Sequence, residues 1–179
     1  MTDDAALVAA LEAIQVRGAI GESSIRRAIE HAEQYVHKVP ASAGTLVDLG
    51  SGGGLPGVVI AVRCPWLHVT LVERRATRGD LLRRAVHALG VTDRVVVLTE
   101  DVAAVAGRSP AAFDVVSARS FAAPSITARW ASVLLRPGGV LIVSEPPEDD
   151  PERWSAALLA RTQLLDQGRD GGVRTFLRR

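Results

Sequence analysis

The sequence predicts an α/β fold built around a mostly parallel β-sheet, and three observations lead to this prediction. Short apolar runs alternate along the chain with stretches of helical apolar spacing, which is the order found when helices connect parallel strands. The runs are almost continuously apolar and β-branched, as is typical of strands buried on both faces. A glycine-rich segment separates the first run from the next helical stretch. With 179 residues, the chain fits one domain with a substantial core.

Two helices are expected before the first strand. Apolar residues recur at helical spacing over residues 3–16 and again over residues 22–38, and the turn-forming sequence "VPASAG" follows. We therefore expect an N-terminal helical segment, residues 1–40, and a core, residues 41–179, within a single domain.

The core is expected to alternate strands and helices. Strands are predicted over 46–49, 67–72, 95–98, 113–116 and 140–143, and helices over 56–62, 78–89 and 120–135, with a short turn near 101–106. Two short final strands are predicted over 162–166 and 173–177, because the Gly171-Gly172 pair between them favours a tight turn.

Bulk composition excludes several classes of protein. The formal net charge is only +1, so charge gives no general indication of nucleic-acid binding, although arginines cluster locally. No apolar run is long enough for a transmembrane helix, and the first residues lack the basic region of a secretory signal. The single cysteine, Cys64, cannot form an internal disulfide. We expect a cytoplasmic protein.

The glycine-rich segment indicates a binding site for a nucleoside cofactor. Gly52, Gly54 and Gly57 match the pattern G-x-G-x-x-G, Gly50 adds another glycine, and Pro56 suits the first turn of the following helix. Missing side chains let a ligand lie against the backbone at the positive end of the helix. Ser51 and Leu55, within the same turn, are also expected to contact the cofactor.

Acidic residues at successive strand ends extend this site. Glu73 follows the turn by roughly twenty residues, where a carboxylate binds ribose hydroxyls in NAD and S-adenosylmethionine sites alike. Asp48 before the turn, and Glu100 and Asp101 after the third strand, favour S-adenosylmethionine, with its ammonium group and adenine amine. Asp101 is equally suited to cap a helix. The neighbouring Arg74 and Val102 complete the predicted cofactor-binding set.

The motifs resemble those of class I S-adenosylmethionine-dependent methyltransferases. They are "VDLGSGGGLPG", "VTLVERR", "LTEDV", "FDVVSARSF" and "LLRPGGVLIVS". More narrowly, "DLGSGGGLPG" and "FDVVSARSF" resemble the glucose-inhibited division protein B family, which methylates a guanine ring nitrogen of small-subunit ribosomal RNA. The resemblance extends over roughly residues 28–145.

This resemblance implies a Rossmann-like, seven-stranded sheet whose last strand is antiparallel, with helices on both faces. It implies cofactor contacts from Asp48, the glycines of the turn and Glu73. It also implies a functional arginine at Arg119, which we expect to be catalytic and to contact the cofactor as well. Phe121 is placed either to stack on a planar substrate or to pack in the core.

The chain departs from the family pattern at three cationic positions. Thr77 stands where the family has lysine, Asp101 stands where it has arginine (Glu100 if the register slips by one), and Glu145 follows the fifth strand in place of a Lys-Gly pair. The family's N-terminal segment is also longer. Since phosphate binding needs cations, these changes allow a divergent relative with another substrate or an RNA recognised by other residues.

Three functional hypotheses follow. The chain is an RNA guanine methyltransferase acting on the small ribosomal subunit, a divergent methyltransferase of a small molecule, or a non-catalytic domain that binds S-adenosylmethionine. An aromatic ring nitrogen is nucleophilic without a general base, which agrees with the lack of a catalytic dyad in the sequence. The four histidines lack metal-ligand spacing, so no metal is expected, and His31 is assigned to a helix surface.

Overall fold

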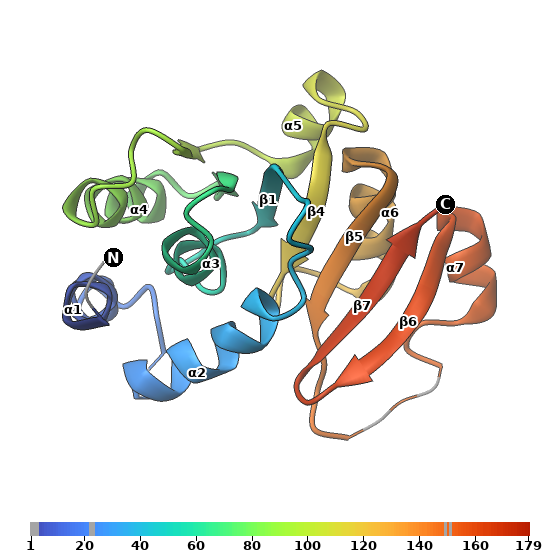
Figure 1. Cartoon of the computed structure of the whole chain (residues 1–179), viewed down its shortest axis with the longest axis horizontal. Helices are drawn as coiled ribbons and strands as arrows, with labels where there is room; N and C mark the ends of the chain where they lie inside the picture. Colours follow the sequence, from blue (N-terminus) through green and yellow to red (C-terminus); the bar gives the residue numbers. More distant parts are fainter. Residues whose placement is uncertain (1–3, 22–23, 149, 151) are drawn as a thin grey trace.

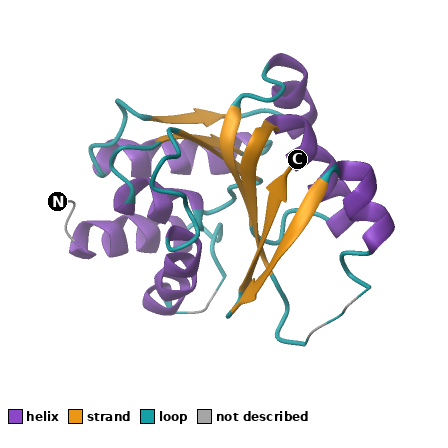
Figure 2. Ribbon diagram, turned by 45° about the vertical axis from the view of Figure 1, so that its right-hand side comes forward, coloured by secondary structure: helices purple, strands orange, loops and turns teal. Residues whose placement is uncertain are grey.

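A computed structural model describes residues 4–21, 24–148, 150 and 152–179. The chain forms one central β-sheet with helices on both faces (Figures 1 and 2). The two N-terminal helices are α1 (Asp4–Gln15) and α2 (Ile25–Val36). Residues 3, 22 and 23 of the predicted helices lie outside the described residues.

The sheet confirms the predicted topology. Its strands are β1 (Thr45–Leu49), β2 (His68–Val72), β3 (Val95–Leu98), β4 (Phe113–Ala118), β5 (Leu135–Ser144), β6 (Leu164–Asp170) and β7 (Val173–Arg178). Their order in the sheet is β3-β2-β1-β4-β5-β7-β6. Strands β1 to β5 pair in parallel, whereas β7 is antiparallel to both β5 and β6.

The remaining helices lie between the strands. They are α3 (Gly57–Arg63), α4 (Ala76–Ala88), α5 (Val102–Arg108), α6 (Pro124–Leu134) and α7 (Ala156–Thr162). The predicted turn near 101–106 is wrong, because the Asp101 side chain accepts a hydrogen bond from the Ala103 N–H (2.8 Å) and so caps a helix there. The predicted strand at 162–166 begins too early, because α7 extends to Thr162 and Gln163 ends it in the left-handed conformation (φ 53°).

Alternate residues of the central strands face two separate apolar layers. Leu46 packs in one layer with α1, α2, α3 and α4, and Val47 packs in the other with α5, α6 and α7. Both side chains are fully buried. The parallel strands are therefore covered on both faces, as their apolar composition predicts.

Helix α2 also contacts the far end of the chain. The Gly172 N–H in the β6–β7 turn donates to Gln34 Oε1 (2.7 Å), and Lys38 Nζ lies 2.7 Å from Asp170 Oδ2. The Tyr35 hydroxyl donates to the carbonyl of Ala118 at the end of β4 (3.1 Å). Figure 1 shows α2 beside the lower end of the β6–β7 hairpin.

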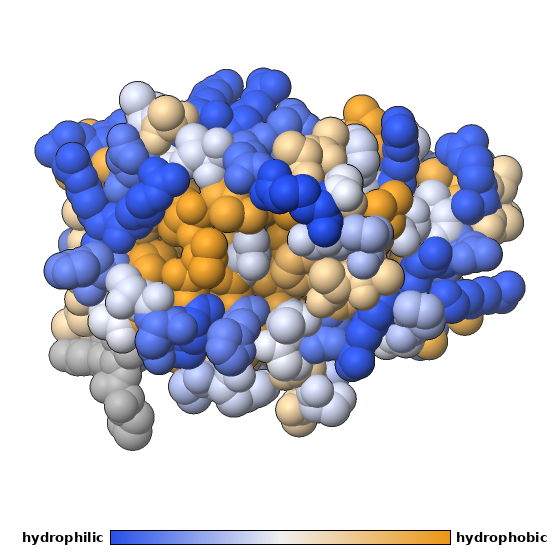
Figure 3. All heavy atoms as spheres, turned by 90° about the horizontal axis from the view of Figure 1, so that it is seen from above, coloured by the Kyte–Doolittle hydropathy of each residue, from blue (hydrophilic) through white to orange (hydrophobic). Residues whose placement is uncertain are grey.

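The surface is mixed in character. Figure 3 shows an apolar region in the middle of one face, surrounded by hydrophilic side chains. Scattered exposed apolar atoms are normal for a folded chain. Within the described part of the chain, none of the helices combines the length and the apolar character needed to cross a membrane.

Candidate functional site

The glycine turn connects β1 to α3, and close packing explains two of its glycines. Gly50 has φ 64°, and an added Cβ would lie 2.7 Å from Phe121 Cδ2. At Gly57, an added Cβ would lie 2.5 Å from Leu71 Cδ2, so a side chain there would push α3 away from β2. The turn is therefore glycine-rich partly because helix, strand and loop approach one another closely.

A pocket of about 460 Å³, here called the glycine-turn pocket, lies beyond the carboxyl ends of β1, β2 and β3. Six of the predicted cofactor-binding residues line it: Gly50, Glu73, Arg74, Glu100, Asp101 and Val102. The pocket is not lined by the other predicted residues of the turn, which lie beneath it: Ser51, Gly52, Gly54 and Leu55. Sequence reasoning missed its apolar wall, Ile126 and Trp130 on α6.

Glu73 connects the glycine turn to the start of α4. Its Oε2 accepts a hydrogen bond from the Gly52 N–H (3.0 Å), and its Oε1 accepts one from the Arg75 N–H (2.8 Å). The residue is only 5% exposed, yet it lines the pocket. Since each carboxylate oxygen has a second lone pair, Glu73 retains acceptor capacity for a ligand hydroxyl.

Asp48 lies beneath the turn and lines neither of the two pockets of the site. It is 1% exposed, and its Oδ1 accepts a hydrogen bond from the Ser117 hydroxyl (2.7 Å). Burial raises the pKa of Asp48 to about 6, although the hydrogen bond from Ser117 and the positive charge of Arg119 both oppose the rise. Its carboxylate thus positions the turn from below.

A second pocket, here called the arginine pocket, lies beyond the carboxyl ends of β4 and β5. It has a volume of about 330 Å³ and contains Arg119 together with Glu145 and Arg153. Ser120 and Phe121 line both pockets, so the two adjoin. Arg119 is therefore placed beside the glycine-turn pocket and not in its wall.

Arg119 and its neighbour His31 both have unused hydrogen-bonding capacity. Its Nη1 is buried and makes no hydrogen bond to any described residue, and the same is true of His31 Nδ1. His31 lies on α2, is half-buried and lines the arginine pocket, a role that the sequence did not indicate. Burial lowers the pKa of His31, and the positive charge of Arg119 lowers it further.

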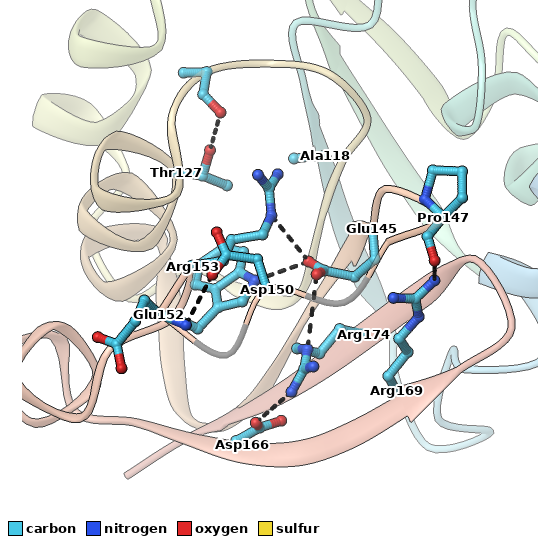
Figure 4. A network of polar contacts seen from close by, with 12 residues as sticks. Ala118, Thr127, Glu145, Pro147, Asp150, Glu152, Arg153, Asp166, Arg169 and Arg174 are labelled. Atoms are coloured by element: carbon cyan, nitrogen blue, oxygen red, sulfur yellow. Dashed lines mark hydrogen bonds and ion pairs between the residues drawn. The ribbon is translucent and has the colours of Figure 1, made fainter.

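Glu145 is buried and paired with neighbouring side chains. Its Oε1 accepts a hydrogen bond from Trp154 Nε1 (2.8 Å) and lies 3.5 Å from Arg153 Nε, while its Oε2 lies 3.9 Å from Arg174 Nε. Figure 4 shows both arginines converging on this carboxylate. The acidic residue after β5 therefore adds little unbalanced negative charge to the pocket.

Comparison with known proteins identifies the family. Residues 20–152 match the family model described as rRNA small subunit methyltransferase G. A Stenotrophomonas maltophilia protein named ribosomal RNA small subunit methyltransferase G is 41% identical over 100 residues, which are 55% of this chain and 45% of that protein. One of the same name from Nocardioides is 36% identical over 171 residues, 88% of this chain and 66% of that protein. The chain spans about half the length of the first of these relatives.

Solved structures agree on the fold. A cofactor-bound protein from MTB, Rv0187, superposes with a TM-score of 0.67 at 21% identity over 98% of this chain and 90% of that one. An O-methyltransferase from Bacillus cereus, solved in complex with SAH, gives a TM-score of 0.66 at 16% identity over 98% of this chain and 92% of that one. At these identities the similarity concerns the class I methyltransferase fold. The matched family model, together with this fold, shows that the chain belongs to the rRNA small subunit methyltransferase G (GidB) family.

Proposed function

We propose that this chain is an S-adenosylmethionine-dependent methyltransferase that modifies a guanine ring nitrogen of small-subunit ribosomal RNA, in the cytoplasm. One observation carries the proposal beyond family membership: the glycine-turn pocket and the arginine pocket share Ser120 and Phe121. A cofactor in the first pocket and a base in the second would meet at this shared wall. Such an arrangement favours transfer by proximity and orientation.

The residues of the glycine-turn pocket fit the cofactor. Glu73 offers acceptors for ribose hydroxyls, and Gly50 leaves the backbone accessible beside them. Ile126 and Trp130 provide an apolar wall suited to an adenine ring, with Asp101 and Val102 nearby. When bound, S-adenosylmethionine supplies an electrophilic methyl group.

The arginine pocket fits a purine acceptor. Phe121 offers an aromatic face for stacking, and Arg119 brings a buried guanidinium donor for the base or its sugar-phosphate backbone. In this proposal Arg119 is the catalytic residue that orients the base, while the ring nitrogen itself acts as the nucleophile. Within the described residues, there is no group of three or more histidine, cysteine or acidic side chains arranged to hold a metal ion.

Methyl transfer to ribosomal subunits tests the proposal. Purified protein and radiolabelled S-adenosylmethionine are incubated with small subunits from a strain that lacks the modification, and the product nucleoside is identified by mass spectrometry. We expect a single N7-methylguanosine. Arg119→Ala should lower kcat/KM by at least about a hundredfold, because an orienting interaction in the transition state would be lost.

Binding of S-adenosylhomocysteine, measured by calorimetry, separates the alternatives. Glu73→Gln should weaken this binding, whereas Arg119→Ala should leave it nearly unchanged, because Arg119 lines the other pocket. Cofactor binding with no transfer to subunits would contradict the RNA substrate and favour a small-molecule acceptor. No binding at all would contradict the enzymatic function.

A further inference from the structure

Arg153 is the second arginine of the arginine pocket, and it comes from the segment between β5 and α7. Figure 4 shows its guanidinium group pointing from this segment toward the region between Ala118, at the end of β4, and Thr127, in α6. Ala118 and Thr127 both line the pocket. Arg153 therefore projects a cation into the pocket from a different side of the fold than Arg119, which directly follows β4.

The contacts of Arg153 leave its guanidinium end available. Its Nε lies 3.5 Å from Glu145 Oε1, which is an ion pair without a hydrogen bond. Glu145 is itself held by the Trp154 indole N–H at 2.8 Å and is only 8% exposed. The carboxylate thus lies against the Nε end of the guanidinium of Arg153, a residue that lines the pocket.

The charges in this region leave a positive excess. Arg119 and Arg153 line the pocket with one carboxylate, Glu145, which leaves one positive charge among the lining residues. Arg174 lies 3.9 Å from that carboxylate but is itself paired with Asp166 at 2.6 Å, so it adds nothing to this excess. Two guanidinium groups facing one cavity repel each other unless an anion lies between them. Planar guanidinium groups bind phosphate oxygens with paired hydrogen bonds, which makes a phosphate the best-matched anion.

We infer that Arg153 is a specificity-determining residue that binds a backbone phosphate next to the methylated guanine, and that Glu145 is its positioning residue. This inference rests on the proposed function, because it names how the acceptor is recognised in the same site. It also explains how the pocket can bind a nucleotide although Glu145 brings an acid into it.

Nucleotide binding to the arginine pocket tests the inference. The full chain, saturated with S-adenosylhomocysteine, is titrated with guanosine 5′-monophosphate, with guanosine and with inorganic phosphate. Binding is followed through the indole N–H resonance of Trp154, which donates to Glu145, with exposed Trp66 as an internal reference. We expect the nucleotide to bind about tenfold more tightly than guanosine, the difference that one charge-assisted phosphate contact supplies.

Arg153→Gln should abolish this preference, and Arg153→Lys should retain part of it. Arg161→Gln is the matched control, because Arg161 is an exposed arginine on α7 that lines neither pocket, and it should behave as wild type. A nucleotide preference that survives Arg153→Gln would overturn the inference, and so would inorganic phosphate binding as tightly as the nucleotide. Equal melting temperatures establish that the variants are folded.

Glu145 is tested by a double-mutant cycle. Glu145→Gln should reduce the nucleotide preference severalfold in the wild-type background and have no effect in the Arg153→Gln background. Equal effects in the two backgrounds would contradict the positioning role.

Steady-state kinetics separate this inference from the proposed function. With subunits as substrate, Arg153→Gln should raise KM and leave kcat nearly unchanged, because the phosphate contact exists before and during transfer. An unchanged KM would overturn the inference while the methyltransferase activity stands. An Arg153-dependent nucleotide preference in a protein that methylates no subunits would support the phosphate site and contradict the proposed function.

Discussion

The carboxylate of Asp48 lies at the centre of the fold in a place that disfavours its charge. Burial raises its folded-state pKa to about 6, above a reference value of 3.8. The folded chain therefore holds this proton more strongly than the unfolded chain does. The resulting stabilisation is complete below pH 3.8 and is lost as pH rises to about 6, which costs on the order of 3 kcal/mol above that pH.

Asp48→Asn should therefore stabilise the fold at neutral pH. Its amide oxygen can still accept the Ser117 hydrogen bond, while the buried charge disappears. Urea unfolding between pH 4 and pH 8 should show a gain of up to about 3 kcal/mol that grows with pH and levels off above pH 6. Asp93→Asn, at an exposed position, serves as control. A gain that is the same at pH 4 and pH 8 would contradict the buried-charge explanation.

Gly50→Ala tests the contact between the turn and Phe121. The new Cβ would lie 2.7 Å from the ring, so Phe121 would move within the wall that the two pockets share. We expect at least about tenfold weaker binding of S-adenosylhomocysteine by calorimetry. Gly90→Ala is a matched control, since Gly90 has nearly the same φ of 66° with no atom within 4 Å of an added Cβ. The Gly90→Ala variant should be less stable than the wild type but should bind S-adenosylhomocysteine equally well.

At the scale of secondary-structure elements, α2 holds the β6–β7 turn through one partly buried and one exposed contact. Gln34 receives the Gly172 N–H in a partly buried position, whereas Lys38 pairs with an Asp170 side chain that is 77% exposed. Hydrogen bonds that leave a buried donor unpaired when removed cost more than exposed ion pairs. The two contacts should therefore differ in strength.

Gln34→Ala should lower the unfolding free energy by about 1 to 2 kcal/mol, because the Gly172 N–H would lose its acceptor. Lys38→Ala should cost less than about 0.5 kcal/mol. Chemical denaturation of both variants at low and high salt distinguishes them, since only the ion pair is screened. Equal losses would show that the turn is held by packing and not by these polar contacts.

Strands β1 to β5 were predictable because each carries its own apolar run, whereas helices α5 and α7 were not. Helix α5 is short and rich in alanine, and it is stabilised by the Asp101 cap and by the burial of Val102 and Val105. Helix α7 is stabilised by apolar contacts of Leu158 with residues distant in sequence. The local sequence pattern does not reveal such contacts, because tertiary packing can override helix propensity.

The candidate site was predictable where a motif follows a strand. Gly50 and Glu73 stand at the ends of adjacent parallel strands, so their meeting follows from topology. His31 and Arg153 come from a helix and a connecting segment far apart in sequence, and only the folded chain brings them to one pocket. The environment of Glu145 likewise depends on its contacts with Trp154 and Arg174, and no pattern of sequence spacing predicts these contacts.

At the scale of the whole molecule, α1 and α2 share an apolar layer with the central strands. Leu7 and Tyr35 are fully buried in the same layer as Leu46. We propose that the N-terminal helical segment, residues 1–40, and the core, residues 41–179, unfold as a single cooperative unit.

The aromatic residues allow a direct test of this cooperativity. The only tyrosine, Tyr35, lies in α2, whereas the three tryptophans lie within residues 41–179, at positions 66, 130 and 154. We expect tyrosine absorbance and tryptophan fluorescence to give the same urea midpoint, as two-state unfolding requires. Separate midpoints would show that the helical segment unfolds independently.

The order of strands in the sheet has a consequence for synthesis. Strand β7 lies between β5 and β6, although it follows both in the chain. While the ribosome is still making residues 173–178, β5 keeps one edge unpaired and β6 has no neighbour to join. Translation adds residues within fractions of a second, so this open edge is brief but unavoidable. Until the hairpin closes, Glu145 lacks Arg174 and the neighbouring pocket lacks its final form.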